Sequence, residues 1–439
     1  MYFSIPDTTD ISAKRSSNQH AFTLFNIHVN GNHHCSLRYS QLRAFNDELQ
    51  RLFPVSMINI QPFPPKKFFN LSLREIDERR ILLERYLQSV VQHKSLISSS
   101  YFDDFFLNAQ RETFLSELVN KTYSEKINFT IYLLNQHKII IENLSPYDNT
   151  SKLFDACANK IQLENEYLSY FSLFFYELKN NQLNIIRPLF SFESPYLSLE
   201  KALKLNENYC IVFKKTYWNL NYDFKLIDNR RTRNLLFIQS QYDIEQSEDL
   251  YPSDIYQQLN ILYENNSFKE YILLSRTSKF YGYIILQQCS INDLITEKLS
   301  QCILTIGNNE LLCCIINDDK KNTNLFTKEF SFKVTRIRCW KVNCAKQNVN
   351  IAFEYLIKKD TLQWITIYTE QAALVSTCLQ SMVDEILANK VITTSSISIS
   401  DSSNNRSNIT NGLTTRTKSD LDRLNNNELF DKGDGDDDL

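Results

Sequence analysis

The chain has 439 residues, of which 43% are hydrophobic and 13% aromatic, and its formal net charge at pH 7 is −3. That length allows roughly three domains with separate cores. The near-neutral charge excludes the uniformly basic character of a general nucleic-acid binder. We therefore expect a multidomain α+β protein with no nucleic-acid partner.

Cysteine usage and hydropathy indicate the cytosol. The ten cysteines show neither a metal-ligand spacing nor a disulfide framework. The opening MYFSIPDTTD has no apolar signal region, and no window reaches about 18 unbroken apolar residues. We expect a cytoplasmic protein that holds no metal and no cofactor.

The sequence contains no motif for catalysis. Of six glycines, Gly412, Gly433 and Gly435 lie near the C-terminus, and the other three cannot supply the Gly-rich loop of a nucleotide site. No GxSxG, HExxH or HRD-type motif occurs. A binding protein is favoured over an enzyme of lipid metabolism.

A small α+β domain is predicted first. The alternating run Ala21–Val29 is followed by Asn30-Gly31 and then by a second run, which is a strong hairpin signal. Ser40 is expected to precede a helix. The proline-rich loop Pro62–Pro65 separates this helix from a second one around Glu75–Val91.

The middle of the chain predicts two lobes. The probable hairpin Ile127–Leu134 and His137–Glu142, the helix Lys152–Ile161 and the aromatic strand Phe171–Tyr176 occur in the order of a ubiquitin-like sheet crossed by a helix. Residues 218–290 show helical patterns without clear strands.

Short strands return from Gln301, and the helix Gln371–Leu387 closes a region typical of a pleckstrin-like sandwich. Within it, Phe330–Val342 is predicted to be one strand, and its change of apolar phase indicates a bulge or an exposed face of Arg336, Arg338 and Trp340. After Lys390 the composition turns to Ser, Thr, Asn and Asp, which predicts disorder. The expected units are 1–112, 120–215, 216–292, 293–389 and the tail 390–439.

Four side chains of the first domain suit a phosphorylated inositol headgroup. Arg38 and Arg79 offer planar forks of donors to phosphate oxygens or hydroxyls, and Lys66 offers a point charge on a proline-stiffened loop. Tyr39 offers a flat ring for the carbon face of the sugar. Each alone is more often an ordinary surface or core residue, and their ordered combination favours the site.

Three apolar residues follow the loop lysines. Phe68, Phe69 and Leu71 are predicted to enter the bilayer interface together with these lysines. Apolar burial and electrostatic attraction would then act at the same place.

The strings RYS, PPKK and RRxxLExYL (Arg79–Leu87) resemble the PX domain of sorting nexins. This resemblance implies phosphatidylinositol 3-phosphate as the lipid, with Arg38 on the 3-phosphate, Tyr39 on the ring, Lys66 on the 1-phosphate and Arg79 on the distal hydroxyls. Lys67 and Arg80 leave a one-residue ambiguity at two of these positions.

Further strings are similar, in order, to the PX-FERM subfamily of sorting nexins: FSIP, NIHVNG, YFSLF, VTRIRCW, AFEYL and LQSMVDEI. The fold implied is a PX domain followed by a three-lobed FERM-like module and a disordered tail. The place implied is the cytoplasmic face of early endosomes, as a peripheral protein. A FERM-type scaffold between membrane and cytoskeleton is the alternative, which would favour a basic C-terminal segment.

A pleckstrin-like lobe can bind an extended peptide between an edge strand and its closing helix. The resemblance implies that this groove binds NPxY or NxxY motifs in receptor tails of the lipoprotein-receptor and integrin type. Arg338, Trp340, Val383 and Leu387 are the residues implied. Taken singly, Trp340, Val383 and Leu387 are more often core residues.

The acidic end of the chain, Asp436, Asp437, Asp438 and Leu439, resembles the ending of a member of this subfamily. The resemblance implies that the Retriever complex binds this end. Asn427 and Phe430 form an NxxF motif, and we hypothesise that it occupies the chain's own cargo groove. The roughly 36 residues between Lys390 and this motif form a flexible tether, which spans roughly 30–36 Å and is long enough to cross a lobe.

Overall fold

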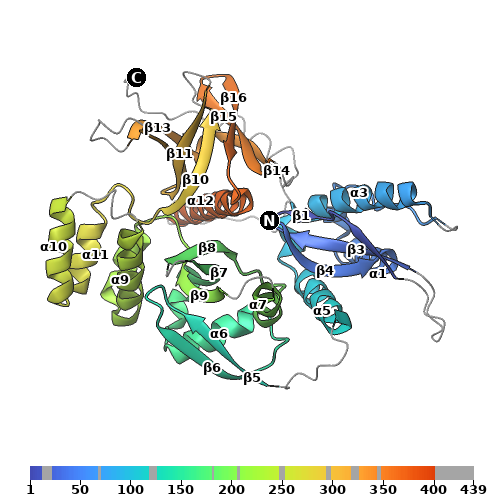
Figure 1. Ribbon diagram of the computed structural model, residues 1–439, viewed down its shortest axis with the longest axis horizontal. Helices are drawn as coiled ribbons and strands as arrows, with labels where there is room; N and C mark the ends of the chain where they lie inside the picture. Colours follow the sequence, from blue (N-terminus) through green and yellow to red (C-terminus); the bar gives the residue numbers. More distant parts are fainter. Residues whose placement is uncertain are drawn as a thin grey trace, which may run out of the picture.

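The computed structural model describes residues 1–11, 22–67, 71–117, 126–179, 182–204, 208–246, 253–292, 298–317, 326–343 and 348–400. Within these residues the chain forms a PX-like unit, a ubiquitin-like lobe, a helical lobe and a pleckstrin-like lobe (Figure 1). The expected multidomain α+β fold is confirmed. The expected tail beyond Ser400 lies outside the described residues.

The first unit packs a small sheet against helices. Its elements are β1 (Phe3–Ser4), β2 (Thr8–Ile11), β3 (Phe22–Val29), β4 (Asn32–Arg38), α1 (Tyr39–Leu52), α2 (Pro54–Met57), α3 (Leu73–Val90), α4 (Lys94–Ile97) and α5 (Ser100–Glu117). Asn30 and Gly31 have φ of 50° and 82°, the positive values that a two-residue hairpin turn requires. The predicted hairpin is therefore confirmed.

Two details of the first unit differ from expectation. Helix α1 begins at Tyr39, before Ser40, because the Gln41 side chain accepts a hydrogen bond from the Arg38 backbone N–H at 2.9 Å and so closes the helix start. Helix α5 was not predicted. Its Phe102 and Phe106 are fully buried against the β1 residue Phe3.

The ubiquitin-like lobe is a five-stranded sheet crossed by a helix. Its elements are β5 (Ile127–Tyr132), β6 (Lys138–Leu144), α6 (Thr150–Lys160), the 3-10 helix η1 (Asn165–Tyr170), β7 (Phe171–Lys179), β8 (Gln182–Pro188), α7 (Pro195–Leu203) and β9 (Tyr209–Lys215). The strand order is β6-β5-β9-β7-β8, with β5 and β9 parallel at the centre. The predicted topology is confirmed.

The helical lobe consists of α8 (Tyr222–Asp228), α9 (Arg230–Glu245), α10 (Ser253–Glu264) and α11 (Phe268–Ser275). Its buried Phe237 stacks on Phe268 with ring centroids 4.2 Å apart. The core of this lobe is continuous with that of the ubiquitin-like lobe.

The pleckstrin-like lobe is a seven-stranded sheet closed by one long helix. Its elements are β10 (Ile284–Asn292), β11 (Leu299–Gly307), β12 (Glu310–Ile316), β13 (Phe326–Lys333), the 3-10 turn η3 (Val334–Arg336), β14 (Ile337–Asn343), β15 (Asn350–Lys358), β16 (Thr361–Tyr368) and α12 (Ala372–Ser400). The strand order is β13-β12-β11-β10-β16-β15-β14. Because β13 and β14 are consecutive in the chain yet form the two edges, the sheet folds over on itself.

Three expectations about this lobe were wrong. Strand β10 pairs with β11 and β16, so it belongs to this lobe and the expected boundary after residue 292 falls too late. Phe330–Val342 is not one strand, because η3 turns the chain from one edge of the sheet to the other. The predicted irregularity does occur within it, where the pairing of β14 with β15 shifts register between Ile337 and Cys339. Helix α12 continues past Leu387 to Ser400.

The units share buried contacts, so the PX-like unit is not an independent body. Phe192 of the ubiquitin-like lobe is 2% exposed and packs among the rings of the PX-like core. Helix α12 links three units: Thr377 accepts a hydrogen bond from Asn30 of the PX-like hairpin turn at 3.2 Å, and Glu385 accepts one from the Trp218 backbone N–H at 2.8 Å.

Candidate functional site

The Tyr39 ring, the proline-rich loop and helix α3 meet in the PX-like unit. Tyr39, at the start of α1, donates its hydroxyl to the Pro64 carbonyl at 2.8 Å, which ties the proline-rich loop to the helix. The Arg79 guanidinium on α3 lies over the Tyr39 ring, 4.2 Å from its centroid. Two of the predicted lipid residues, 40 positions apart, are therefore in contact.

One guanidinium N–H group of Arg79 has no hydrogen-bond acceptor among the described residues. Its Nη2 is buried and forms no hydrogen bond within the part of the chain that the structure describes. Burial lowers the pKa of Arg79, and the nearby Tyr39 and Glu75 oppose that shift. A buried, unsatisfied guanidinium N–H costs free energy unless an anionic or hydroxyl ligand accepts from it.

Arg38 is the exposed member of the group. It stands at the junction of β4 and α1, and its guanidinium lies over the Phe22 ring at 3.3 Å from the centroid. The ring restricts the side chain and leaves the guanidinium edge open to solvent. A phosphate could accept there in a bidentate manner.

Lys67 and Arg80, the alternatives to Lys66 and Arg79 in the lipid site, both have structural partners. Lys67 forms an ion pair with Glu75 at 2.8 Å, and this hydrogen bond lowers the pKa of Glu75 to about 2. Arg80 donates to the Ile5 carbonyl at 2.5 Å and to Asp77 at 2.8 Å. Lys66 is exposed on the loop. Of the two ambiguous pairs, Lys67 and Arg80 are thus engaged in structural contacts.

Of the predicted bilayer residues, Phe68 and Phe69 lie outside the described residues, and Leu71 is half-buried. The structure adds Leu73, which sequence reasoning missed. It opens α3 and is 79% exposed, and its only signal in the sequence was its place two residues after Leu71.

The predicted peptide groove lies between β14, an edge strand, and α12. Trp340 is half-buried, and its indole N–H donates to the Ser376 hydroxyl of α12 at 2.9 Å. Val383, two turns further along α12, packs against the same core. Because Ser376 and Val383 are seven residues apart, Val383 shares the face of α12 that contacts Trp340.

The other two predicted groove residues lie apart from Trp340. Leu387 is 53% exposed, one turn beyond Val383. Arg338 forms an ion pair with Glu354. Since Trp340 is paired with the buried Phe353, whereas Glu354 is opposite the exposed Trp364, this ion pair draws Arg338 to the outer face of the sheet.

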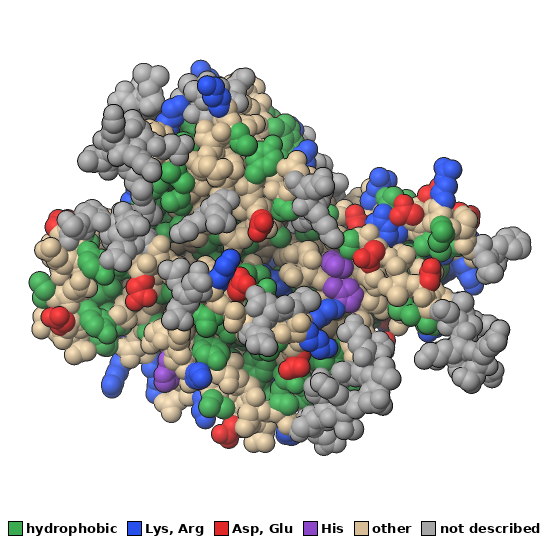
Figure 2. All heavy atoms as spheres, viewed as in Figure 1, with side chains coloured by type: hydrophobic (Ala, Val, Ile, Leu, Met, Phe, Trp, Pro, Cys, Tyr) green, Lys and Arg blue, Asp and Glu red, His purple; other side chains and the backbone are tan. Residues whose placement is uncertain are grey.

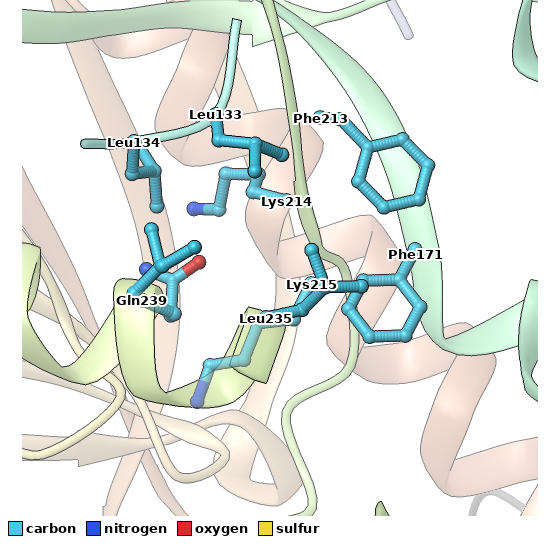
Figure 3. Close-up of a pocket in the computed structure, with 9 residues that line it drawn as sticks. Leu133, Leu134, Phe171, Phe213, Lys214, Lys215, Leu235 and Gln239 are labelled. Atoms are coloured by element: carbon cyan, nitrogen blue, oxygen red, sulfur yellow. The ribbon is translucent and has the colours of Figure 1, made fainter. Parts of the chain in front are cut away.

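A small cavity between the ubiquitin-like and helical lobes is not a ligand site. Figure 3 shows Lys214 and Gln239 pointing towards one another inside it. Its volume of about 10 Å³ admits roughly one water molecule. Burial lowers the pKa of Lys214 to about 8. Along the described segments we find neither a cluster of metal-ligating side chains nor a helix long and apolar enough to cross a membrane.

Four family models match successive parts of the chain. They are the PX domain over residues 25–109, the sorting nexin 17/27/31 FERM F1 lobe over 127–218, the sorting nexin 17/31 FERM F2 lobe over 219–279 and the Sorting Nexin 17 FERM C-terminal domain over 282–387. The fold and these matches define a PX-FERM protein of the sorting nexin class.

Relatives match over most of their length. The chain is 38% identical to sorting nexin-17 of Danio rerio and 35% identical to that of Homo sapiens, in both cases over 89% of this chain and 82% of the relative. Sorting nexin-31 of Homo sapiens is 31% identical over 88% of this chain and 86% of the relative. The chain belongs to the sorting nexin-17 family and is an adaptor of the endosomal sorting type.

Proposed function

We propose that this protein binds phosphatidylinositol 3-phosphate on early endosomes through its PX domain and NPxY or NxxY motifs of receptor tails through its FERM module. Cargo held in this way is directed to recycling and away from degradation. The protein acts as a peripheral membrane adaptor and carries out no catalysis.

In the lipid site, Arg38 binds the 3-phosphate, Tyr39 packs on the inositol ring, Lys66 binds the 1-phosphate and Arg79 donates to the distal hydroxyls. The buried Nη2 of Arg79 supports this assignment because this donor has no acceptor among the residues that the structure describes. Phe68, Phe69 and Leu71 enter the interface beside the headgroup, and the exposed Leu73 extends that apolar contact.

In the cargo groove, an extended peptide adds to the free edge of β14 by main-chain hydrogen bonds. Trp340 and Val383 form its apolar wall, and Leu387 covers the end of the peptide at the exposed part of α12. Arg338, held by Glu354, flanks the strand on its outer side.

One contact supports the proposal that the protein binds lipid and cargo at the same time. The Asn30 side chain in the PX hairpin turn donates to Thr377 on α12, one residue from Ser376, which accepts from Trp340. The helix that closes the cargo groove is thus attached to the domain that binds the membrane. Both ligands are presented to one body in a defined relative orientation.

Trp340→Ala should weaken binding of an NPxY receptor-tail peptide by roughly 30-fold, because truncating a buried aromatic anchor in an interface costs about 2 kcal/mol or more. Isothermal titration calorimetry with the purified full chain measures the dissociation constant. Trp364→Ala is the matched control, since Trp364 lies on the outer face of the same sheet. Unchanged affinity of Trp340→Ala would remove the groove assignment.

For the tail we propose two roles. Asp436, Asp437, Asp438 and Leu439 recruit the Retriever complex, and the NxxF motif of Asn427 and Phe430 competes with cargo for the groove. Removal of residues 401–439 leaves α12 whole. This truncation should tighten cargo-peptide binding several-fold, since a tethered competitor acts at an effective concentration in the millimolar range. Equal dissociation constants for the two proteins would reject self-occupancy.

A further inference from the structure

The outer face of β14, β15 and β16 carries an exposed aromatic residue. Trp364 on β16 is 46% exposed, and its neighbour Leu362 on the same face is 38% exposed. The opposite face of these strands packs on α12 and the core. The outer face is covered by no other described element.

Basic side chains surround this tryptophan. The Lys341 ammonium on β14 lies over the Trp364 ring, 4.8 Å from its centroid. Lys358 and Lys359 are exposed at the tip of the β15–β16 hairpin, where Asp360 is the nearby acid. Figure 2 shows Lys and Arg side chains beside hydrophobic ones over this hairpin, at the top of the molecule.

The acid nearest the tryptophan in the sheet is already neutralised. Glu354 is opposite Trp364 in the register, but its carboxylate is paired with Arg338 and its side chain is 11% exposed. Lys341, Lys358 and Lys359 therefore outweigh Asp360, and the surface has a net positive charge. It attracts an anionic partner.

We propose that this surface, made of Lys341, Lys358, Lys359, Leu362 and Trp364, is a second membrane contact that binds anionic phospholipid without selecting a headgroup. An indole ring with an apolar neighbour partitions to the headgroup level of a bilayer, and lysines beside it bind acidic lipid. The exposed apolar area of Trp364 and Leu362 is suited to the bilayer interface and has no complement in an aspartate-rich peptide, which favours a lipid surface over an acidic peptide.

This contact adds to the PX site and does not depend on it. Figure 1 shows the β15–β16 hairpin and the far end of the PX domain at two separate extremities of the molecule. Two weak contacts on one rigid body reinforce each other, because the second binds at a high effective concentration once the first is formed. The FERM module would then lie against the bilayer from which the receptor tail emerges.

The fluorescence of Trp364 itself reports whether this surface contacts a membrane. The chain has three tryptophans, so Trp218→Phe with Trp340→Phe leaves Trp364 as the sole indole. Vesicles of phosphatidylcholine with phosphatidylserine should shift its emission to shorter wavelength, and brominated lipid should quench it. The same vesicles without phosphatidylserine should have a much smaller effect. No shift on anionic vesicles would overturn the proposal.

Sedimentation of the otherwise unaltered full chain provides the second measurement. Lys358→Glu and Lys359→Glu should each lower vesicle affinity roughly fivefold, and Trp364→Ser should lower it as well. Leu299→Ser, at a 61% exposed position of β11, is the control and should have no effect. Losses should occur with and without phosphatidylinositol 3-phosphate, whereas a failure of the PX site alone removes only the inositide-dependent fraction.

An acidic peptide is the competing ligand. A peptide of residues 431–439, DKGDGDDDL, carries the acidic end of this chain. If it shifts the Trp364 emission at micromolar concentration while anionic vesicles do not, the surface is a peptide site and the membrane proposal is wrong.

Discussion

Arg38→Ala should lower the affinity of the full chain for vesicles that contain phosphatidylinositol 3-phosphate about 100-fold. Loss of a bidentate, charge-assisted pair with a phosphate costs roughly 3 kcal/mol, and each 1.4 kcal/mol is a factor of ten. The fold should be unaffected, because the start of α1 depends on the Arg38 backbone N–H and the Gln41 side chain, which the substitution retains. Vesicle sedimentation at physiological salt measures the change.

The matched control is Arg74→Ala on the same domain. The Arg74 side chain is 89% exposed, and its one ion pair among the described residues is with Glu78, one turn away on α3. Its removal takes away the same formal charge, so it should change binding by a few-fold at most through the general attraction to an acidic surface. If both variants lose the same affinity, Arg38 contributes only as a diffuse charge and the headgroup site is not where we propose it.

The elements best predicted from the sequence were those with local signals. The Asn30-Gly31 turn carries its own turn chemistry and occurs as predicted. The helix expected around Glu75–Val91 occurs as α3, which begins at Leu73 behind a capping box of Ser72 and Glu75. Strand β10 pairs mainly with the next strand, β11, and it was missed because its sequence IILQQCSIN breaks the period of two where that pairing shifts register, between Leu286 and Cys289. Likewise, the corner at Val334–Arg336 was not recognised, because it interrupts the period of two in the same way as the irregularity that follows it in β14, between Ile337 and Cys339.

The candidate lipid site was predictable in its residue types but not in its geometry. Arg79 and Arg80 are indistinguishable by composition, yet successive helical positions point about 100° apart. That rotation places Arg79 over Tyr39 and sends Arg80 to the Ile5 carbonyl. The direction of the Arg338 side chain also depends on geometry that its residue type does not give. The resemblance implied that Arg338 shares the groove with Trp340, and only the strand register reveals that its partner Glu354 belongs to the outer face.

The junction between the PX domain and the ubiquitin-like lobe could not be predicted from either part alone. Its centre is a bidentate ion pair: Arg187 donates to Glu193 at 2.5 and 2.8 Å. Glu193 also accepts from the Phe190 backbone N–H and the Ser198 hydroxyl, and its side chain is 2% exposed. The next residue, Ser194, donates its backbone N–H to Gln110 of the PX helix α5 at 2.8 Å.

Glu193 is held in its charged form by these contacts. Burial alone would raise the pKa of its carboxyl, but Arg187 and the two other donors outweigh burial and lower it below the usual value. A carboxyl with a lowered folded-state pKa adds stability that is present above its unfolded pKa, near 4.3. That stability is lost as the pH falls through the folded-state value.

Arg187→Met should therefore destabilise the protein by roughly 3–5 kcal/mol at neutral pH, because it leaves the buried Glu193 carboxylate without its cation. In this variant burial raises the carboxyl pKa above its unfolded value. The carboxyl then binds a proton on folding, and the difference from the natural protein should shrink as the pH is lowered from 7.5 to 5. Urea unfolding, followed by circular dichroism at both pH values, measures this trend.

The double variant Arg187→Met with Glu193→Gln distinguishes the ion pair from simple packing. Glutamine keeps one acceptor oxygen for the Phe190 N–H, and its amide N–H can donate to the Ser198 hydroxyl oxygen in place of the second carboxylate oxygen. It carries no charge, so the double variant should regain much of the lost stability and show little dependence on pH. A double variant as unstable as Arg187→Met at both pH values would mean that the contacts of the Arg187 guanidinium with the Phe175 and Phe190 rings, 5.4 and 5.3 Å from their centroids, hold the junction and that the ion pair with Glu193 does not.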